Sequence, residues 1–142
     1  MNNLTTAQAA LSRAKRWHQS ARRGIEDERW DDVIYSYQMA VEQSLKAVLI
    51  LFGMEYPKKH DISGVYLTLK TQDIPKWFLD KIKLHARILK MLVSKRGNSA
   101  YGYVDGITKD NFKDDAIQNK DLVKEIIKDC EELISEFSEK RK

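Results

Sequence analysis

The sequence predicts an all-α protein, an antiparallel up-down bundle of four helices with a short fifth helix. Three observations lead to this prediction. Apolar residues recur at helical spacing in four long segments, the connections between them are short, and glycine and proline number only six and two. A chain of 142 residues with 42% hydrophobic and 32% charged residues can bury one core, so we expect a single domain over residues 1–142.

The first two long helices are expected over about residues 5–27 and 30–52, where apolar residues form one stripe on each helix. Gly53 follows the second helix and is suited to its C-terminal cap, because glycine adopts a left-handed backbone readily. Glu42 and Lys46 are four residues apart on the second helix, so we expect them to form an ion pair on one face.

Three further helices are expected over about residues 62–69, 75–95 and 116–138. The segment 96–115 holds three glycines and is expected to be irregular. Cys130, the single cysteine, falls on the apolar stripe of the last helix. We therefore expect it to be a buried small apolar side chain in a reducing compartment.

The expected helix over 75–95 has an apolar arc that covers more than half of its circumference, wider than one bundle contact requires. One interpretation is a second buried surface, most simply a two-fold dimer contact. The alternative is a helix that is covered within its own bundle by the segment around Tyr66 and Leu67. The sequence alone favours the dimer contact and leaves the alternative open.

The same helix carries most of the basic excess of a chain whose net charge is +4. Residues 76–96 hold five lysines and two arginines against one aspartate, and Lys83 and Arg87 lie on its basic stripe. Such a stripe can attract phosphates of RNA, or it can be an ordinary solvated face. His85 and Arg96 lie instead in the apolar arc, so His85 is expected to be hydrogen-bonded, and Arg96 to meet a carboxylate or a phosphate.

Two segments outside these stripes form a recognisable pattern. The run AVEQSLKAVL over residues 40–49, then Gly53, then KHDI over residues 59–62, matches A-x-E-x-x-L-K-A … G … H-D-L. The segment RGNSAYGY over residues 96–103 follows later in the chain. The first pattern resembles that of HEPN domain proteins, and the second falls where this family places its signature, an arginine and a histidine with four to six residues between them.

The resemblance extends over almost the whole chain and implies a homodimeric helical bundle with the signature at the dimer cleft. In the branch that is paired with small nucleotidyltransferases, the signature reads R-x4-H-x-Y. Arg96 and Tyr103 match its first and last positions, whereas Tyr101 stands where the histidine belongs. Many members are metal-independent endoribonucleases that act as toxins, and the antitoxin of that branch can nucleotidylate the tyrosine. Other members are proposed to bind nucleotides or to assist a nucleotidyltransferase.

The tyrosine at the histidine position bears on cleavage. Cleavage without a metal needs a group that moves protons near neutral pH, which a histidine with a pKa near ~6.5 does and a tyrosine near ~10 does poorly. We therefore expect binding rather than efficient cleavage, with a nucleotide or RNA contacted by Arg96, Asn98, Tyr101, Tyr103, Lys83 and Arg87. If the protein does cleave RNA, Arg96 and Tyr101 are the candidate catalytic residues. The two tyrosines can alternatively pin the glycine-rich segment to the bundle.

Three functions remain open. The first is a homodimeric module that binds a nucleotide or RNA or acts with a nucleotidyltransferase partner of the MNT type. The second is an endoribonuclease toxin of a toxin–antitoxin pair, and the third is a structural dimer without a ligand. No cofactor or metal is expected, because the three histidines and Cys130 are far apart, and His60 is expected to bond loop backbone. No apolar run approaches the ~20 residues that span a bilayer, and no signal peptide is evident, so we expect a cytoplasmic protein.

Overall fold

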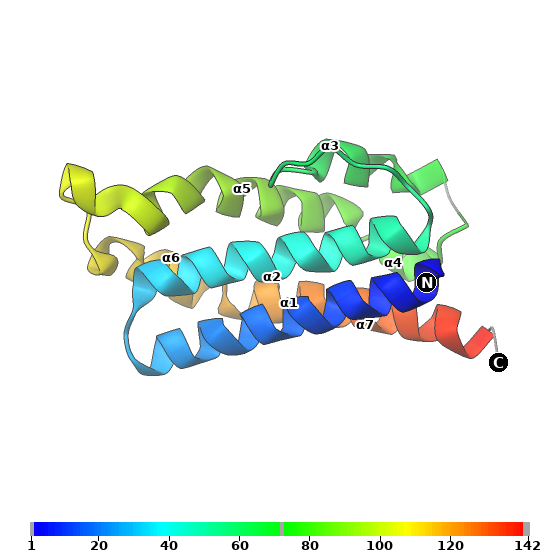
Figure 1. Cartoon of the computed structure of the whole chain (residues 1–142), viewed down its shortest axis with the longest axis horizontal. Helices are drawn as coiled ribbons and strands as arrows, with labels where there is room; N and C mark the ends of the chain where they lie inside the picture. Colours follow the sequence, from blue (N-terminus) through cyan, green and yellow to red (C-terminus); the bar gives the residue numbers. More distant parts are fainter. Residues whose placement is uncertain (1, 72, 141–142) are drawn as a thin grey trace.

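The computed structural model describes residues 2–71 and 73–140, and within these residues every regular element is a helix. Four long helices form the body: α1 (Asn3–Glu26), α2 (Trp30–Leu51), α5 (Ile82–Tyr101) and α7 (Lys120–Lys140). In Figure 1, α1 runs from right to left, α2 returns, α5 runs from right to left again, and α7 returns behind them. The predicted all-α class is confirmed.

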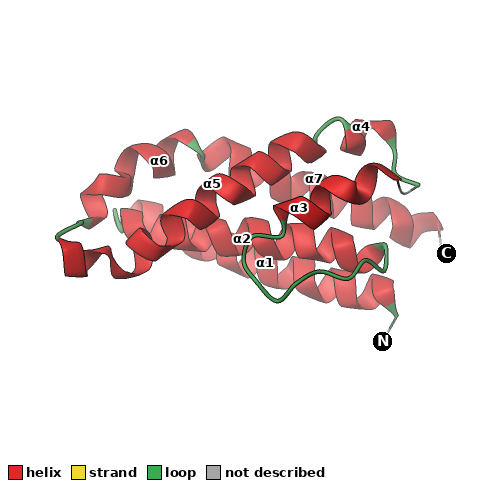
Figure 2. Cartoon of the chain, turned by 90° about the horizontal axis from the view of Figure 1, so that it is seen from above, coloured by secondary structure: helices red, strands yellow, loops and turns green. Residues whose placement is uncertain are grey.

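The shorter elements connect these four helices. Between α2 and α5 lie α3 (Ser63–Tyr66), a 3₁₀ turn (Leu67–Thr71) and α4 (Lys76–Leu79). Between α5 and α7 lie two 3₁₀ turns (Gly102–Asp105 and Lys109–Phe112) and α6 (Lys113–Gln118). Figure 2 shows the loop after α2 running back along the bundle before α3 begins, so this loop passes beside residues in the middle of α2.

Helix α2 is the central helix of the bundle. Fifteen of its 22 residues are buried, and α1, α5 and α7 all pack against it. Close packing with α1 depends on small residues, since a Cβ atom on Gly24 would lie 2.9 Å from Cγ2 of Val33. Gly53 has a φ of 67° immediately after α2, and the N–H of Met54 donates to the carbonyl of Leu49. The predicted glycine cap is therefore confirmed.

The predicted helix over 75–95 begins where expected, but it is interrupted and it extends further than predicted. It is broken at Asp80–Lys81 into α4 and α5, and both Phe78 before the break and Ile82 after it are buried. The break allows both side chains to reach the core, and Lys81 beside it bonds to Asp129 of α7. At the other end, α5 continues through Tyr101 into the segment that was expected to be irregular.

The extension of α5 past Gly97 is held by tertiary contacts. A glycine in a helix interior costs about 1 kcal/mol relative to alanine. Arg96 bonds to α2 on one side of Gly97, and Ser99 is buried on the other. The helix ends at Gly102, where a Cβ atom would lie 2.9 Å from Ile107 and where the N–H of Ile107 donates to the Gly102 carbonyl. Contacts with the rest of the fold thus outweigh the local preference.

The wide apolar arc of the 75–95 segment is largely covered within the chain. Tyr66 of α3 is fully buried, and α3 packs on α5. The remaining apolar members of the arc are partly buried and pack against the core, namely Trp77, Leu84, Met91 and Val93. The covered-helix alternative therefore accounts for the arc, and the arc gives no separate surface for a dimer. On α5 itself, Tyr101 is the large apolar side chain that remains exposed among the described residues.

Candidate functional site

Arg96 lies in the last part of α5 and reaches across to α2. Its Nε donates to Oε1 of Gln38 at 2.8 Å, and its Nη2 donates to the hydroxyl of Tyr35 at 3.0 Å. The guanidinium carbon lies 4.9 Å from the centre of the Tyr35 ring, a distance at which cation–π attraction operates. No carboxylate of a described residue pairs with Arg96, so of the two predicted partners the carboxylate is excluded within the described chain.

The amide of Gln38 is fully buried and can take only one orientation. Its oxygen faces Arg96, which only donates, and its nitrogen donates to Oε1 of Glu42 at 2.5 Å. A carboxylate only accepts, so a flipped amide would set two donors against each other at Arg96 and two acceptors at Glu42. The position of Arg96 therefore depends on Glu42, which lies one helical turn from Gln38 on α2.

Glu42 is a buried carboxylate whose charge is compensated. Lys46 donates to its Oε2 at 2.9 Å, which confirms the predicted ion pair. His60 approaches the other oxygen through Nδ1 at 2.8 Å, because the loop after α2 folds back along that helix (Figure 2). The prediction that His60 bonds loop backbone is therefore wrong. Its imidazole instead satisfies a carboxylate that would be costly to bury alone.

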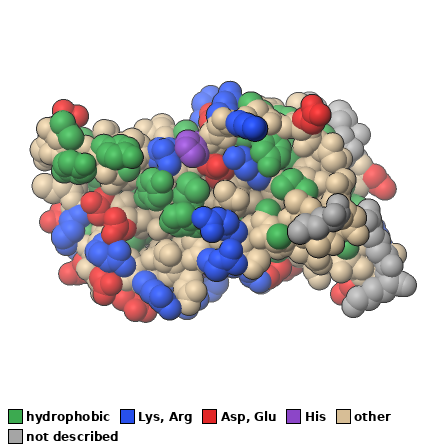
Figure 3. All heavy atoms as spheres, in the orientation of Figure 1, with side chains coloured by type: hydrophobic (Ala, Val, Ile, Leu, Met, Phe, Trp, Pro, Cys, Tyr) green, Lys and Arg blue, Asp and Glu red, His purple; other side chains and the backbone are tan. Residues whose placement is uncertain are grey.

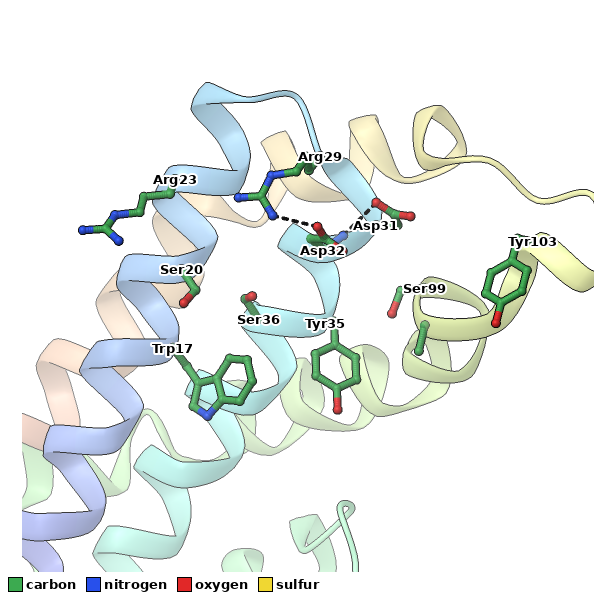
Figure 4. A pocket seen from close by; sticks show the side chains of 11 residues that line it. Trp17, Ser20, Arg23, Arg29, Asp31, Asp32, Tyr35, Ser36, Ser99 and Tyr103 are labelled. Carbon is green, nitrogen blue, oxygen red and sulfur yellow. Dashed lines mark hydrogen bonds and ion pairs between the residues drawn. The ribbon is translucent and has the colours of Figure 1, made fainter.

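A pocket of about 640 Å³ opens beside Tyr35, between the α1–α2 pair and the end of α5 (Figure 4). Three aromatic side chains from different elements line it: Trp17 of α1, Tyr35 of α2, and Tyr103 of the turn after α5. The ring centres of Trp17 and Tyr35 are 6.0 Å apart. Hydroxyl groups also line the pocket, those of Ser20, Ser36 and Ser99. The pocket thus offers ring faces and hydrogen-bonding groups together.

The charges around this pocket are unevenly compensated. Arg29 is paired with Asp32 at 2.8 Å and with Asp27 at 3.4 Å. The hydrogen bond from Arg29 to Asp32 raises the pKa of Arg29. Arg23 lines the pocket without a carboxylate partner among the described residues, and in Figure 4 it extends to the outer side of α1. Arg23 is thus the cation of the lining that has no carboxylate partner among the described residues, Asp31 and Asp32 add two carboxylates to the lining, and Arg96 is connected to the pocket through Tyr35.

The six predicted site residues do not gather in one place. Tyr103 lines the same pocket as Tyr35, whose hydroxyl accepts a hydrogen bond from Arg96, but Arg96 itself does not line that pocket. Tyr101 is 66% exposed and lines none of the described pockets. Asn98 lines a different hollow beside Ile107, Asn111 and Phe112. Tyr103, Tyr101 and Asn98 therefore lie in three different surroundings within one chain, and Arg96 is connected to the aromatic pocket through Tyr35.

Lys83 and Arg87 lie elsewhere, along a shallow groove of about 460 Å³ between α3 and α5 that Leu67 and Lys90 also line. At 100° per residue, Arg87 and Arg96 are about half a turn apart around α5. Figure 3 shows lysine and arginine side chains gathered over the α3–α5 edge, apart from a hydrophobic group near the left end of the view. The basic stripe and the Arg96 pocket are therefore distinct surfaces.

The sequence did not single out Tyr35, Gln38 or Glu42 as site residues. Gln38 and Glu42 carry a signal, because they are polar residues next to the apolar stripe of α2 and both are buried. Tyr35 carries none, since an aromatic residue on an amphipathic helix is ordinary. Its role depends on Arg96, which lies 61 residues later in the chain.

A second buried polar cluster centres on His85, which is fully buried. Its Nδ1 lies 2.8 Å from the Tyr66 hydroxyl and its Nε2 lies 2.9 Å from Oδ2 of Asp129. Burial alone would raise the pKa of Asp129, but hydrogen bonds from His85 and Lys81 outweigh it and lower that pKa. Burial raises the pKa of the Tyr66 hydroxyl. The predicted hydrogen-bonded His85 is confirmed, and the cluster joins α3, α5 and α7.

Within residues 2–71 and 73–140, no three histidine, cysteine, aspartate or glutamate side chains come together as metal ligands would. Among the same described residues, none of the helices has the length and apolar character needed to cross a bilayer. Cys130 is fully buried, as predicted, and burial raises the pKa of its thiol.

The family comparison gives one result. A family model described as the HEPN domain matches residues 7–140, which is nearly the whole chain. No curated protein and no solved structure matches the chain.

Proposed function

Because the chain belongs to the HEPN domain family, a family of nucleotide- and RNA-related modules, we propose that it binds a phosphate-bearing nucleotide or RNA through Arg96. The supporting observation is that the Arg96 side chain is held in place without a neutralising carboxylate. Arg96 is half-buried and fixed by Gln38 and Tyr35, yet it has no carboxylate partner among the described residues. An arginine held this way is costly unless an anion completes its surroundings.

The geometry of Arg96 leaves donors for a ligand. A guanidinium has five N–H groups, and the structure engages the Nε and one Nη2 group. The remaining N–H groups suit two oxygens of a phosphate, which arginine binds with paired hydrogen bonds. Since Tyr35 and Gln38 already fix the side chain, binding requires little further ordering of Arg96.

The aromatic lining supplies the second half of the proposed ligand contact. Bases of nucleotides and of single-stranded RNA stack on exposed ring faces, and each such stack contributes about 1–3 kcal/mol. Trp17, Tyr35 and Tyr103 line the pocket next to Arg96. Its volume of about 640 Å³ lies within the range of small-molecule sites. A single nucleotide therefore suits the pocket, with its base among the rings, and its phosphate would extend past Tyr35 to Arg96.

The decisive experiment measures binding of nucleotides and short single-stranded RNA by calorimetry or fluorescence anisotropy. Arg96→Ala removes charged hydrogen bonds to the phosphate, and we expect about a 10- to 100-fold loss of affinity. Lys128→Ala, which removes an exposed cation on α7, is the control and should bind as the wild type does. Tyr35→Phe keeps the ring and loses the hydroxyl contact, so it should retain most of the binding. Equal affinities of wild type and Arg96→Ala would refute the proposal.

We further propose that RNA longer than one nucleotide follows the exposed face of α5. Lys83 and Tyr101 are 18 residues apart, which is five full turns, so they share one face and are separated by about 27 Å along the helix. Arg87 lies near this line. Lys83→Glu combined with Arg87→Glu should therefore weaken RNA binding steeply, reduce its salt dependence, and leave mononucleotide binding unchanged. Equal losses of affinity for RNA and for the mononucleotide would exclude a separate RNA surface.

The proposed assembly is a homodimer that forms through the end of α5. Tyr101, Tyr103 and Val104 are 66%, 73% and 76% exposed, and three large apolar side chains within four residues are an uncommon surface for a monomer. A two-fold contact there would bring Tyr101 of one protomer towards the partner. Sedimentation at tens of micromolar tests this: the wild type should be dimeric and Tyr101→Ser with Val104→Ser monomeric. A monomeric wild type would exclude the assembly.

The resemblance adds a nucleotidyltransferase of the MNT type as the partner protein. Tyr103 is the candidate for modification, and its exposure leaves the hydroxyl accessible to such an enzyme. Co-expression with a nucleotidyltransferase encoded beside this chain, followed by mass spectrometry, tests the pairing. The expected product carries a nucleotide on Tyr103. If neither Tyr103 nor Tyr101 carries a nucleotide, the proposed modification is excluded.

Endoribonuclease activity is the less supported function. Cleavage without a metal needs a proton-moving group beside the scissile phosphate. Among the described residues, no histidine contacts Arg96, and His60 reaches it only through Glu42 and Gln38. We therefore expect purified protein to leave single-stranded RNA intact in the presence of a chelator. Cleavage that is lost in Arg96→Ala would instead establish the nuclease.

A further inference from the structure

A second, smaller pocket lies between α1 and α7, on a different face of α1 from the aromatic pocket. Its volume is about 230 Å³. His18 and Arg22 come from α1, Lys120 and Lys124 come from α7, and Tyr37 of α2 contributes its ring. Ile25 completes the lining. Helices α1 and α7, which are distant in sequence, thus bring three cations and a histidine to one concave site, and α2 contributes Tyr37.

The charges in this pocket have no counterpart. None of its lining residues is acidic, and Arg22, Lys120 and Lys124 form no ion pair with a described carboxylate. Lys120 and Lys124 are one helical turn apart, a spacing at which like charges repel each other along a helix. Asp121 raises the pKa of Tyr37 but does not line the pocket. The arrangement is therefore unfavourable without an added anion.

The floor of the pocket is already satisfied. The hydroxyl of Tyr37 donates to the carbonyl of Ala116 at 2.8 Å. Burial, and to a lesser extent the negative charge of Asp121, raises the pKa of Tyr37 to about 12. The phenol therefore stays neutral near pH 7 and is engaged with the backbone. The groups left for a ligand are the cations on the rim and the imidazole of His18, which is partly buried.

We infer that this pocket binds a phosphate group, either inorganic phosphate or the phosphate end of a small phosphorylated ligand. Cations that converge from α1 and α7 suit a compact, multiply charged oxyanion. The volume of about 230 Å³ is below the ~300 Å³ at which pockets for whole drug-sized ligands begin, so it holds a phosphate or diphosphate and not an entire nucleotide. The site does not depend on the Arg96 pocket, because the two share no lining residue.

His18 reports on the occupancy of this pocket. Burial first, and then the charges of Arg22 and Lys124, lower its pKa in the unliganded protein. A bound phosphate would offset those charges and favour the protonated imidazole. The chain has only three histidines, so the ring protons of His18 can be assigned by NMR with a His18→Gln variant.

The experiment is an NMR pH titration of the full chain in chloride and in about 10 mM phosphate at equal ionic strength. We expect phosphate to raise the pKa of His18 by ~0.5 unit or more. If pyrophosphate raises the pKa of His18 at a lower concentration than phosphate does, the site binds a diphosphate end. If the two anions raise it at equal concentrations, the site binds single phosphates. An unchanged His18 titration in both anions overturns the inference.

Matched variants separate a site from general screening. Lys120→Gln combined with Lys124→Gln should abolish most of the phosphate-dependent shift of His18. Lys58→Gln combined with Lys59→Gln removes the same formal charge from an exposed loop and should leave the shift intact. Because all four lysines are exposed, both double variants are expected to fold. Equal shifts in the two double variants would overturn the inference.

Discussion

A comparison of Asp129 with Glu125 separates the effect of burial on stability from the effect of ion pairing, because both carboxylates bond to the same lysine. Each has an oxygen 3.0 Å from Nζ of Lys81. They differ in surroundings: the Asp129 side chain is 6% exposed and also bonds to fully buried His85, whereas Glu125 is 47% exposed. We predict that Asp129→Ala is strongly destabilising and that Glu125→Ala is close to neutral.

The magnitudes follow from the partners that each substitution leaves behind. Removing the carboxylate of Asp129 leaves Nε2 of His85 without a partner in a site that water does not reach, which costs about 1–3 kcal/mol. The loss of a hydrogen bond to a charged group adds about 1.5 kcal/mol, for a total of about 2.5–4.5 kcal/mol. Lys81 is partly exposed and can be rehydrated, so losing Glu125 costs about 0.5 kcal/mol or less.

Urea unfolding followed by circular dichroism measures both changes. We expect the Asp129→Ala transition to move to a lower urea midpoint with an unchanged slope, which indicates a change in stability and not in the exposed surface. Glu125→Ala should overlay the wild-type transition. The reasoning is refuted if the two variants lose similar stability, because burial would then not determine the contribution of these carboxylates.

Three further predictions follow from other features. Glu28 has a φ of 56°, so Glu28→Gly relieves a left-handed backbone and should raise the free energy of unfolding by about 1 kcal/mol; an unchanged melting temperature would contradict this. The pKa of Asp129 is lowered by folding, so its contribution is complete above the unfolded value near ~3.9 and is lost as pH falls through the folded value. The stability gap between wild type and Asp129→Asn should therefore stay constant from about pH 7 to 5 and narrow below about pH 4 in denaturation measurements. Burial raises the pKa of the Cys130 thiol, so iodoacetamide should label it only after unfolding, and rapid labelling of the native protein would exclude this.

Much of the fold was predictable because helical stripes are local. The periodic apolar residues of α2 and α7 identified both helices, and Gly53 identified the end of α2. The break between α4 and α5 was not predictable, because Asp80 and Lys81 carry no strong helix-breaking signal. It results from packing Phe78 and Ile82 into one core.

The candidate site was predictable only in part for a related reason. Arg96 stood out because a basic residue in an apolar arc needs a partner. The identity of that partner could not be read from the sequence, since Gln38 is 58 residues away and belongs to another helix. Tyr101 was grouped with Arg96 because it stands at the histidine position of the R-x4-H-x-Y signature. The structure instead continues the helix through Tyr101, and helical geometry turns these two side chains in different directions.

The fixed amide of Gln38 has a consequence for how this protein can vary over evolution. Each hydrogen bond from Arg96 through Gln38 to Glu42 runs in one direction, so the three residues are compatible only as a set. A change at Glu42 alone removes the reason for the amide to face Arg96, and a change at Arg96 alone leaves a buried oxygen unpaired. Homologous chains should therefore exchange these three positions together, and a chain that has lost the arginine should carry a different pair on α2.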